Sequence, residues 1–314
     1  MPTLHEVQES ILKLKKQAQD DVRRRYLKEL HDYTGNDVIL YAAAFTSGKL
    51  PNIPAFLVSM TLDDVRSFMA ALHGLEGKAL DLIIYSPGGQ MEAAEQIVSY
   101  LRAKYDHIRA IVPQNAMSAA TMIACACDSI VMGKHSAIGP IDPQVTFPTS
   151  QGHFTAPAHA ILKEFERAKA EVVAEPKTAT LWVKKIQSYP PGLLDICEKT
   201  LELSRQKVEE WLATYMFAGR SESKSLASSI ATWLANADEH KTHGRPISIA
   251  KAEEKGLRVE KLEDDQRLQE LVLSVFHATS VTFQVTNCVK IIENHKGRGL
   301  YHLAEIRVAS PKQS

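Results

Sequence analysis

The chain has 314 residues, and its 37 Lys and Arg residues balance its 37 Asp and Glu residues, so the formal net charge is zero. This balance argues against nucleic acid or an anionic membrane surface as the main partner. The cysteines are scattered and form no second pair of the metal-binding type: Cys125, Cys127, Cys197 and Cys288. Such usage is typical of a reduced, cytoplasmic protein.

No stretch of the sequence has the pattern of a membrane span or a secretion signal. Residues 1–25 carry charges throughout, and the longest apolar stretch, 108–132, contains Pro113, Gln114, Asn115 and Asp128. A spanning helix needs an apolar run of about 18 residues or more, with few or no charges. The sequence therefore predicts neither feature.

The first predicted element is an amphipathic helix over about 4–31, with Leu4, Val7, Ile11 and Leu14 on one face. It is either an oligomerisation arm or a solvated flanking helix. Strands and helices then alternate. The predicted strands cover 38–45, 80–86, 108–113 and 129–133, and the predicted helices cover 61–72, with Thr61 as its cap, 90–104 and 117–126. This alternation is typical of βαβ units and predicts a mostly parallel sheet in an α/β fold.

The second half of the chain begins with a helical region over about 157–235, interrupted at Glu175-Pro176 and at the YPPG sequence. A short helix ending at Gly256, an extended piece, a helix over 264–282 and a hairpin over 289–303 are predicted to follow. The predicted organisation is an N-terminal arm (1–34), one main domain (35–300) and a C-terminal tail (301–314).

Two adjacent glycines stand at a strand-to-helix junction within LIIYSPGGQMEAAEQIVSYL, residues 82–101. Pro87 fixes φ, and Gly88 and Gly89 permit a sharp turn with positive φ. Glycines also present backbone N–H groups to a substrate oxygen with no Cβ in the way. Both explanations are open for this stretch alone.

A serine begins the next predicted helix, in VPQNAMSAATMIACACDSIVMGKHSAIGPIDPQ, residues 112–144. Ser118 there is either an N-cap or a nucleophile beside free backbone N–H groups. The carboxyl ends of neighbouring parallel strands meet at one edge of a sheet, where sites form in α/β proteins. We therefore expect the Gly89 and Ala119 amides to flank one oxyanion.

The SPGG sequence, followed about thirty residues later by AMSAATMIACACDSIVMGKHSAIG, resembles the Clp protease and crotonase superfamily. The most similar branch is the one called serine dehydrogenase proteinase, related to signal peptide peptidase A. Further segments resemble this branch over about 35–300: APAHAILKEFERAK, YPPGLL, HGRPIS and LEDDQRLQELVLSVFHAT. The resemblance implies a Clp/crotonase-type spiral of βαβ units with additional C-terminal helices. It also implies a serine hydrolase, most simply a peptidase, that needs no metal or organic cofactor.

The resemblance also assigns roles within the site. Ser118 matches the nucleophile, Gly88 and Gly89 match the oxyanion-hole glycines, and Ala119 supplies the second amide. This assignment implies attack on a scissile peptide carbonyl.

The general base is where this sequence departs from the family pattern. Clp-type peptidases have a histidine near the position of Ile141 or Asp142. In related membrane-bound serine-lysine peptidases a lysine base follows an Ala-Pro-rich segment, where this chain has His159. An imidazole with a pKa of about 6.5 is already a competent base at neutral pH. Lys163, one turn later, is the fallback base, and Asp142 either orients the base or forms an Asx-turn.

Two histidines, His240 and His243, lie in the HKTHGR segment. They lack a third ligand in register, so no metal site is predicted there.

Two other functions remain open. One is a catalytically idle oligomeric scaffold or peptide-binding module. The other is a crotonase-like acyl-thioester enzyme, in which the same oxyanion hole would hold an enolate but the serine would have no role. The resemblance further implies a homo-oligomer, a trimer or hexamer, acting on a peptide or protein substrate. The sequence identifies neither that substrate nor any ATPase partner that delivers it.

Overall fold

The computed structural model describes residues 18–47, 53–149 and 152–304. The chain divides into two compact units, which are described separately. The first unit combines the residues up to Ile138 with those from Pro246 onward, and the second is Gly139–Arg245. The first part of the helix predicted over 4–31, and most of the tail predicted over 301–314, lie outside the described residues.

A seven-stranded sheet forms the centre of the first unit, in the order β11-β10-β1-β2-β3-β5-β9. Its strands are β1 (Asp37–Ala43), β2 (Ala79–Tyr85), β3 (His107–Val112), β5 (Ser129–Met132), β9 (Val259–Lys261), β10 (Cys288–Asn294) and β11 (Gly299–Leu303). The run from β1 to β9 is parallel, whereas β10 pairs antiparallel with both β1 and β11. The predicted mostly parallel α/β sheet is confirmed, and the hairpin predicted over 289–303 is β10–β11.

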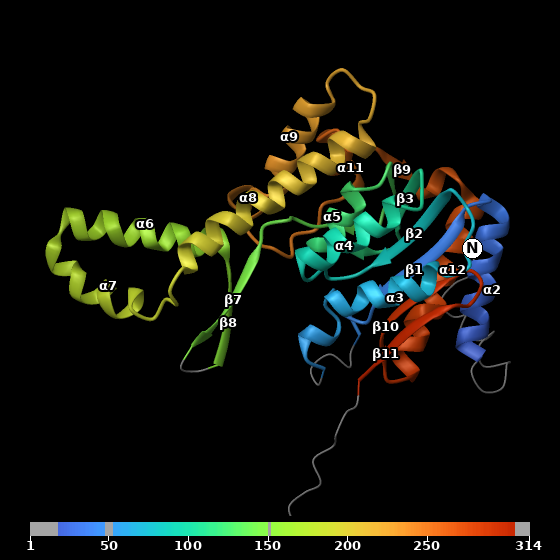
Figure 1. Cartoon of the computed structure of the whole chain (residues 1–314), viewed down its shortest axis with the longest axis horizontal. Coiled ribbons are helices and arrows are strands. Elements are labelled where there is room, and N and C mark those ends of the chain that lie inside the picture. The colour runs from blue at the N-terminus through green and yellow to red at the C-terminus, as the bar shows by residue number, and fades with distance from the viewer. Residues whose placement is uncertain (1–17, 48–52, 150–151, 305–314) are drawn as a thin grey trace, which may run out of the picture. The chain divides into compact units, whose positions relative to one another are not determined.

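Helices cover both faces of this sheet (Figure 1). On one face α2 (Ala18–Thr34) packs along α12 (Gln266–Val285), and Leu27 and Val275 share a buried core with strand residues such as Leu40. On the opposite face, the ring of Tyr41 in β1 contacts Phe68 of α3 (Leu62–Leu72). α4 (Met91–Arg102) packs against both α3 and α5 (Ala119–Cys125). The buried apolar runs of β1 and β2 are those expected of parallel strands covered on both faces.

Short elements complete the first unit. They are β4 (Asn115–Ala116), which pairs with β6 (Ala137–Ile138), the 3₁₀ turns η2 (Ala55–Leu57) and η5 (Leu262–Asp264), and α11 (Ile249–Glu254). The predicted cap of α3 is present, because Thr61 and Asp64 form a reciprocal capping box.

The second unit contains a hairpin followed by helices. The hairpin is β7 (Gln144–Thr149) and β8 (Gly152–Pro157). The helices are α6 (Ala158–Ala174), η3 (Pro176–Thr178), α7 (Ala179–Ile186), α8 (Leu193–Trp211), the π-helical turn η4 (Leu212–Met216), α9 (Ser223–Leu234) and α10 (Ala237–His240). Its small core includes Ile161 and Cys197. The hairpin has no counterpart in the sequence prediction, because β8 is mostly exposed and so lacks the alternation that marks a half-buried strand.

Within the described ranges, no helix is both long and apolar enough to cross a bilayer. All four cysteines are buried and free. Burial raises the pKa of the Cys127 and Cys288 thiols to about 12. Both therefore remain protonated and unreactive at neutral pH.

Candidate active site

Two turns meet at the carboxyl edge of the sheet in the first unit. One leads from β2 to α4 through Ser86, Pro87, Gly88 and Gly89, and the other leads from β3 through β4 to Ser118 and α5. Hydrogen bonds join them: Ser86 N–H donates to Asn115 O at 3.1 Å, and Met117 N–H donates to Ser86 O at 2.9 Å. The two motifs singled out in the sequence are thus parts of one structure.

Ser118 has a backbone conformation that L-residues rarely adopt, with φ of 53° and ψ of −121°. It occupies the N-cap position of α5, but its side chain makes no capping hydrogen bond. The N-cap explanation therefore does not account for a serine here. Such strain costs about 1–3 kcal/mol and is found mainly at functional sites. Ser118 is half-buried and lies on the kind of sharp strand-to-helix turn that exposes a nucleophile.

Other backbone segments pass so close to Gly88 and Gly89 that neither position has room for a Cβ atom. At Gly88, where φ is +87°, a Cβ would lie 2.5 Å from Met117 O and 2.7 Å from Ala119 N. At Gly89, where φ is +154°, a Cβ would overlap the Met60 backbone. The turn therefore needs glycine at two successive positions because it is wedged between two other backbone segments.

The two turns contain three backbone N–H groups of interest, those of Gly88, Gly89 and Ala119. The first is occupied, because Gly88 N–H donates to Ser86 Oγ at 3.2 Å. Within the part of the chain that the structure describes, neither Gly89 N–H nor Ala119 N–H has a hydrogen-bond partner. Unpartnered, fixed donors of this kind can stabilise negative charge on a bound oxygen.

The glycine turn is held in place from the side of α3. Met60 N–H donates to Gly88 O at 2.7 Å, and Gln90 N–H donates to Met60 O at 2.9 Å. Met60 in turn directly precedes the capped N-terminus of α3 at Thr61. The turn thus has a backbone partner on each side.

A buried ion pair anchors this support. Lys290 Nζ lies 2.6 Å from Asp64 Oδ1, and both side chains are 3% exposed or less. The other carboxylate oxygen of Asp64 accepts from Thr61 N–H at 3.0 Å and from Tyr41 OH at 3.1 Å. Burial raises the pKa of Tyr41 well above its ordinary value, and the Asp64 charge acts in the same direction, so the phenol stays a donor.

The predicted bases lie in the second unit. His159 is the second residue of α6, and its Nδ1 is buried without a partner among the described residues. The Lys163 side chain is 65% exposed and lies 2.6 Å from Asp238. A lysine base works in a desolvated pocket, whereas this ammonium group is exposed and already paired with a carboxylate.

Asp142 is buried and faces a histidine that the sequence did not single out as a base. Its Oδ1 lies 2.9 Å from His243 Nδ1, and its Oδ2 accepts from Gln144 Nε2 at 3.1 Å. This is the imidazole–carboxylate pairing that orients a histidine base in hydrolases. The two residues are 101 positions apart, so no local pattern could have revealed the pair.

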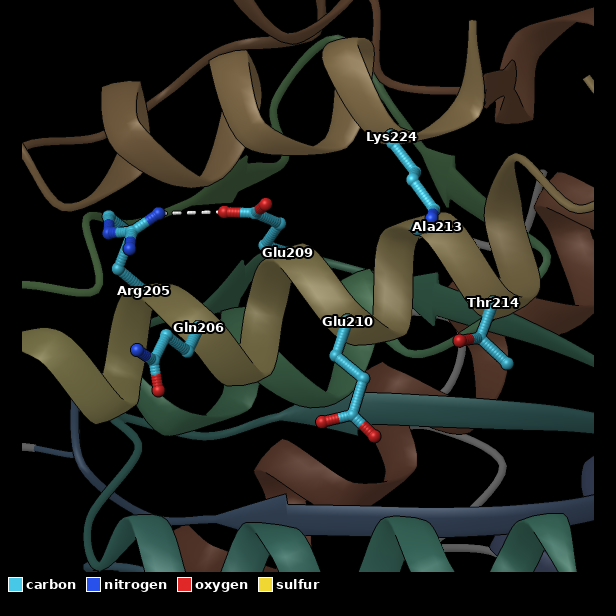
Figure 2. A pocket seen from close by; sticks show the side chains of 7 residues that line it. All are labelled: Arg205, Gln206, Glu209, Glu210, Ala213, Thr214 and Lys224. Carbon is cyan, nitrogen blue, oxygen red and sulfur yellow. Dashed lines mark hydrogen bonds and ion pairs between the residues drawn. The ribbon is translucent and has the colours of Figure 1, made fainter. Parts of the chain in front are cut away.

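The second unit also has a pocket of about 480 Å³ (Figure 2). It lies along α8 and the start of α9 and is lined by Arg205, Gln206, Glu209, Glu210, Ala213, Thr214 and Lys224. Arg205 and Glu209 face each other there at 2.7 Å. The lining includes a hydroxyl, that of Thr214, but no histidine, so this pocket has no nucleophile–base pair.

Comparison with known proteins identifies the family of this chain. Residues 10–277 match the family described as ClpP-like SDH-type serine proteinase. The chain belongs to this family. It is accordingly a serine peptidase, which agrees with the resemblance noted in the sequence.

Two proteins of Methanocaldococcus jannaschii are similar in sequence to this SDH-type proteinase. One, "Uncharacterized protein MJ0137", is 32% identical over 239 residues, which cover 76% of this chain and 73% of that protein. The other, "Uncharacterized protein MJ1495", is 29% identical over 240 residues, covering 76% and 71%.

Among solved structures, two variants of the 1510-N membrane-bound stomatin-specific protease show similarity. One is 15% identical with a TM-score of 0.39, covering 68% of this chain and 79% of that chain. The other, in complex with a substrate peptide, is 14% identical with a TM-score of 0.40, covering 79% and 84%.

Proposed function

We propose that this chain is a serine endopeptidase in which Ser118 Oγ attacks the scissile carbonyl and the N–H groups of Gly89 and Ala119 bind the oxyanion. The observation that carries the proposal is the strained, uncapped Ser118 joined to a turn with unpartnered donors. Fixed donors act where charge develops, and one of them is worth about a hundred- to a thousandfold in rate.

The reaction needs a base that accepts the Ser118 proton and returns it to the leaving amine. Loss of the amine leaves an acyl-enzyme, which water then hydrolyses with the same base taking the water proton. The Ser118 hydroxyl, the backbone N–H groups of Gly89 and Ala119, and the base suffice for these steps.

Two histidines are the leading candidates for this base. His243 is supported by its hydrogen bond to the buried Asp142 carboxylate, which would hold the ring and stabilise the imidazolium. His159 is supported by its place in the APAHAIL segment and by a buried nitrogen with no partner among the described residues. Lys163 is the weaker alternative, because its ammonium group is exposed and already paired with Asp238 at 2.6 Å.

A fluorophosphonate probe tests the nucleophile directly. We expect the full chain to be labelled once, and the label to be lost in Ser118→Ala. Ser99→Ala, at an exposed position on α4, is the matched control and should label as the unaltered chain does. If the unaltered chain is not labelled, the result favours the alternative hypothesis of a catalytically idle scaffold. If Ser118→Ala labels normally, the proposed site is wrong.

The base is tested by the pH dependence of labelling in His243→Gln, His159→Gln and Lys163→Gln. Loss of the base should slow labelling by about a hundredfold or more and abolish the rise through the imidazole pKa. A variant that keeps both the rate and the profile is not the base. If His243 is the base, Asp142→Asn should show the same slow labelling and altered pH profile as His243→Gln. If it is not, Asp142→Asn should label as the unaltered chain does.

We also propose that the peptidase is a cytoplasmic homo-oligomer, a trimer or hexamer, acting on a peptide or protein substrate. Four free, buried cysteines support a reducing compartment, and the resemblance to Clp-type proteins supports assembly. A monomer mass by light scattering at micromolar concentration would contradict the assembly.

A further inference from the structure

A basic pocket of about 700 Å³ lies in the first unit, at the amino-terminal edge of β1, away from the Ser118 turn at the carboxyl edge. One wall is α2 and the other is the β10–β11 turn. The basic lining residues are Arg24, Arg25, Lys28 and Lys296, and His31 and His295 also line the pocket. Two carboxylates, Asp21 and Asp32, also line it, so cations outnumber acids by four to two.

Some of these cations are only weakly neutralised. Arg24 forms an ion pair with Glu293 at 2.5 Å, and Lys28 forms one with Asp32 at 2.6 Å. By contrast, among the residues that the structure describes, the carboxylate nearest to Arg25 is that of Glu29, at 3.8 Å. Lys296 Nζ donates to the carbonyl of Gly74 at 2.8 Å and has no carboxylate partner within the described residues. One under-neutralised cation therefore stands on each wall.

The turn that carries Lys296 is rigid. The buried Asn294 accepts, through Oδ1, from the N–H groups of Lys296 and Arg298 at 2.9 and 3.0 Å. Its Nδ2 donates to Ala71 O at 2.6 Å. Preorganised cations bind an anion more tightly, because less side-chain and loop entropy is lost on binding.

A metal ion is the competing occupant, because His31, Asp37 and His295 each place one ligand atom within 4.8 Å of the others. The two rings, however, are stacked, with centroids 3.8 Å apart and planes 8° from parallel. Imidazole lone pairs lie in the ring plane, so two parallel rings cannot both point at one ion about 2 Å away. Asp37 Oδ2 also already accepts from Gly77 N–H and Tyr105 OH at 3.0 Å. This geometry disfavours a metal held by both histidines.

We propose that this pocket binds a small anion with two or more phosphate groups. A single phosphate would meet one wall, whereas a chain of phosphates can meet Arg25 on α2 and Lys296 on the turn together. The pocket volume falls in the range of small-molecule sites. This site is separate from the proposed peptidase chemistry and does not depend on it.

The test uses inorganic tripolyphosphate, titrated calorimetrically into the full chain at low and at physiological salt. We expect saturable binding that weakens with salt and falls about tenfold in each of Lys296→Gln and Arg25→Gln, since a charge-assisted contact is lost. Orthophosphate should bind more weakly than tripolyphosphate.

Lys169→Gln is the matched control, because this exposed lysine lies on α6 of the second unit. Binding that Lys169→Gln weakens as much as Lys296→Gln is non-specific and overturns the proposal, as does an absence of binding. Zinc binding that is lost in His31→Gln, without any tripolyphosphate binding, would favour the metal instead. Fluorophosphonate labelling of Ser118 should be the same in all these variants, so the two proposals fail independently.

Discussion

The two units differ in their ion pairs: among the described residues, only the first unit has pairs in which both side chains are buried. In the first unit the pairs Lys290–Asp64 and Arg23–Glu293 are buried, with side chains 3% exposed or less. In the second unit Lys163–Asp238 and Lys169–Glu166 lie on the surface, with side chains 57–65% exposed. A buried pair is strongly destabilising when one partner is removed, whereas an exposed pair contributes little.

One buried pair of the first unit lies next to the backbone that forms the proposed active site. The Lys290–Asp64 pair lies behind the glycine turn, and the strained Ser118 backbone lies beside it. Both features cost free energy on their own and persist because the surrounding structure fixes them. Breaking one of the buried pairs of the first unit should therefore change stability far more than breaking an exposed pair of the second.

The largest effect is expected for Lys290→Met. It leaves the Asp64 carboxylate buried without its cation and should lower the free energy of unfolding by about 3–5 kcal/mol, measured by urea denaturation. The double variant Lys290→Met/Asp64→Leu removes both charges and should recover part of that loss. If the single variant loses less than about 1 kcal/mol, as a surface pair would, the contrast between the units fails.

A smaller effect is expected from acid on the first unit. Burial, and then the neighbouring His31, lower the pKa of His295 to about 4. In the unfolded chain the pKa is about 6.5, so between these values the unfolded state binds more protons. Stability should therefore fall by about 1–2 kcal/mol as the pH drops from about 6.5 to about 4, allowing for solvent screening. In His295→Gln this part of the pH dependence should disappear; an unchanged profile would assign the loss to other groups.

The Ser118 strain predicts a gain in stability together with a loss of activity. Ser118→Gly relieves the backbone at φ of 53°. It should be more stable than Ser118→Ala by about 1 kcal/mol, the strain being partly offset by glycine's greater chain entropy. Neither variant should react with the fluorophosphonate. Equal unfolding midpoints for the two variants would show that the conformation is not strained.

The smallest effect is expected in the second unit. Lys169→Gln removes the exposed pair with Glu166 and should change the free energy of unfolding by about 0–0.5 kcal/mol, still less at high salt. Thermal unfolding at two salt concentrations measures this. A loss comparable to that of Lys290→Met would contradict the distinction drawn between the units.

The sequence predicted most of the first unit, because its signals are local. Alternating apolar strands and helices gave β1, β2, β3 and β5, and the Thr61 and Gly256 signals marked helix ends. The resemblance placed Ser118 and the two glycines in one site, and the structure joins their turns by hydrogen bonds. The strands and helix ends depend on residues near one another in the chain, whereas the meeting of the two turns was implied by the resemblance.

What the sequence could not predict depends on distant partners. Nothing local shows that β10 lies beside β1, or that Lys290 pairs with Asp64, 226 positions away. The pairing of Asp142 with His243 is of the same kind. The structure also shows that Gly89→Ala is not a clean test of the donor, because its Cβ would overlap the Met60 backbone and displace the turn.

The position of β10 has a consequence for synthesis on the ribosome. β1 is the first strand of the sheet, yet its antiparallel partner pairs Ile39 with Asn294, so the sheet closes only after nearly the whole described chain has emerged. Until then that side of β1 is an open apolar edge, a position prone to association with other chains. The second unit is one continuous segment, Gly139–Arg245, and it is complete in the growing chain before β10 is made. Newly made molecules therefore have a period in which a partly built sheet must be kept apart from its neighbours.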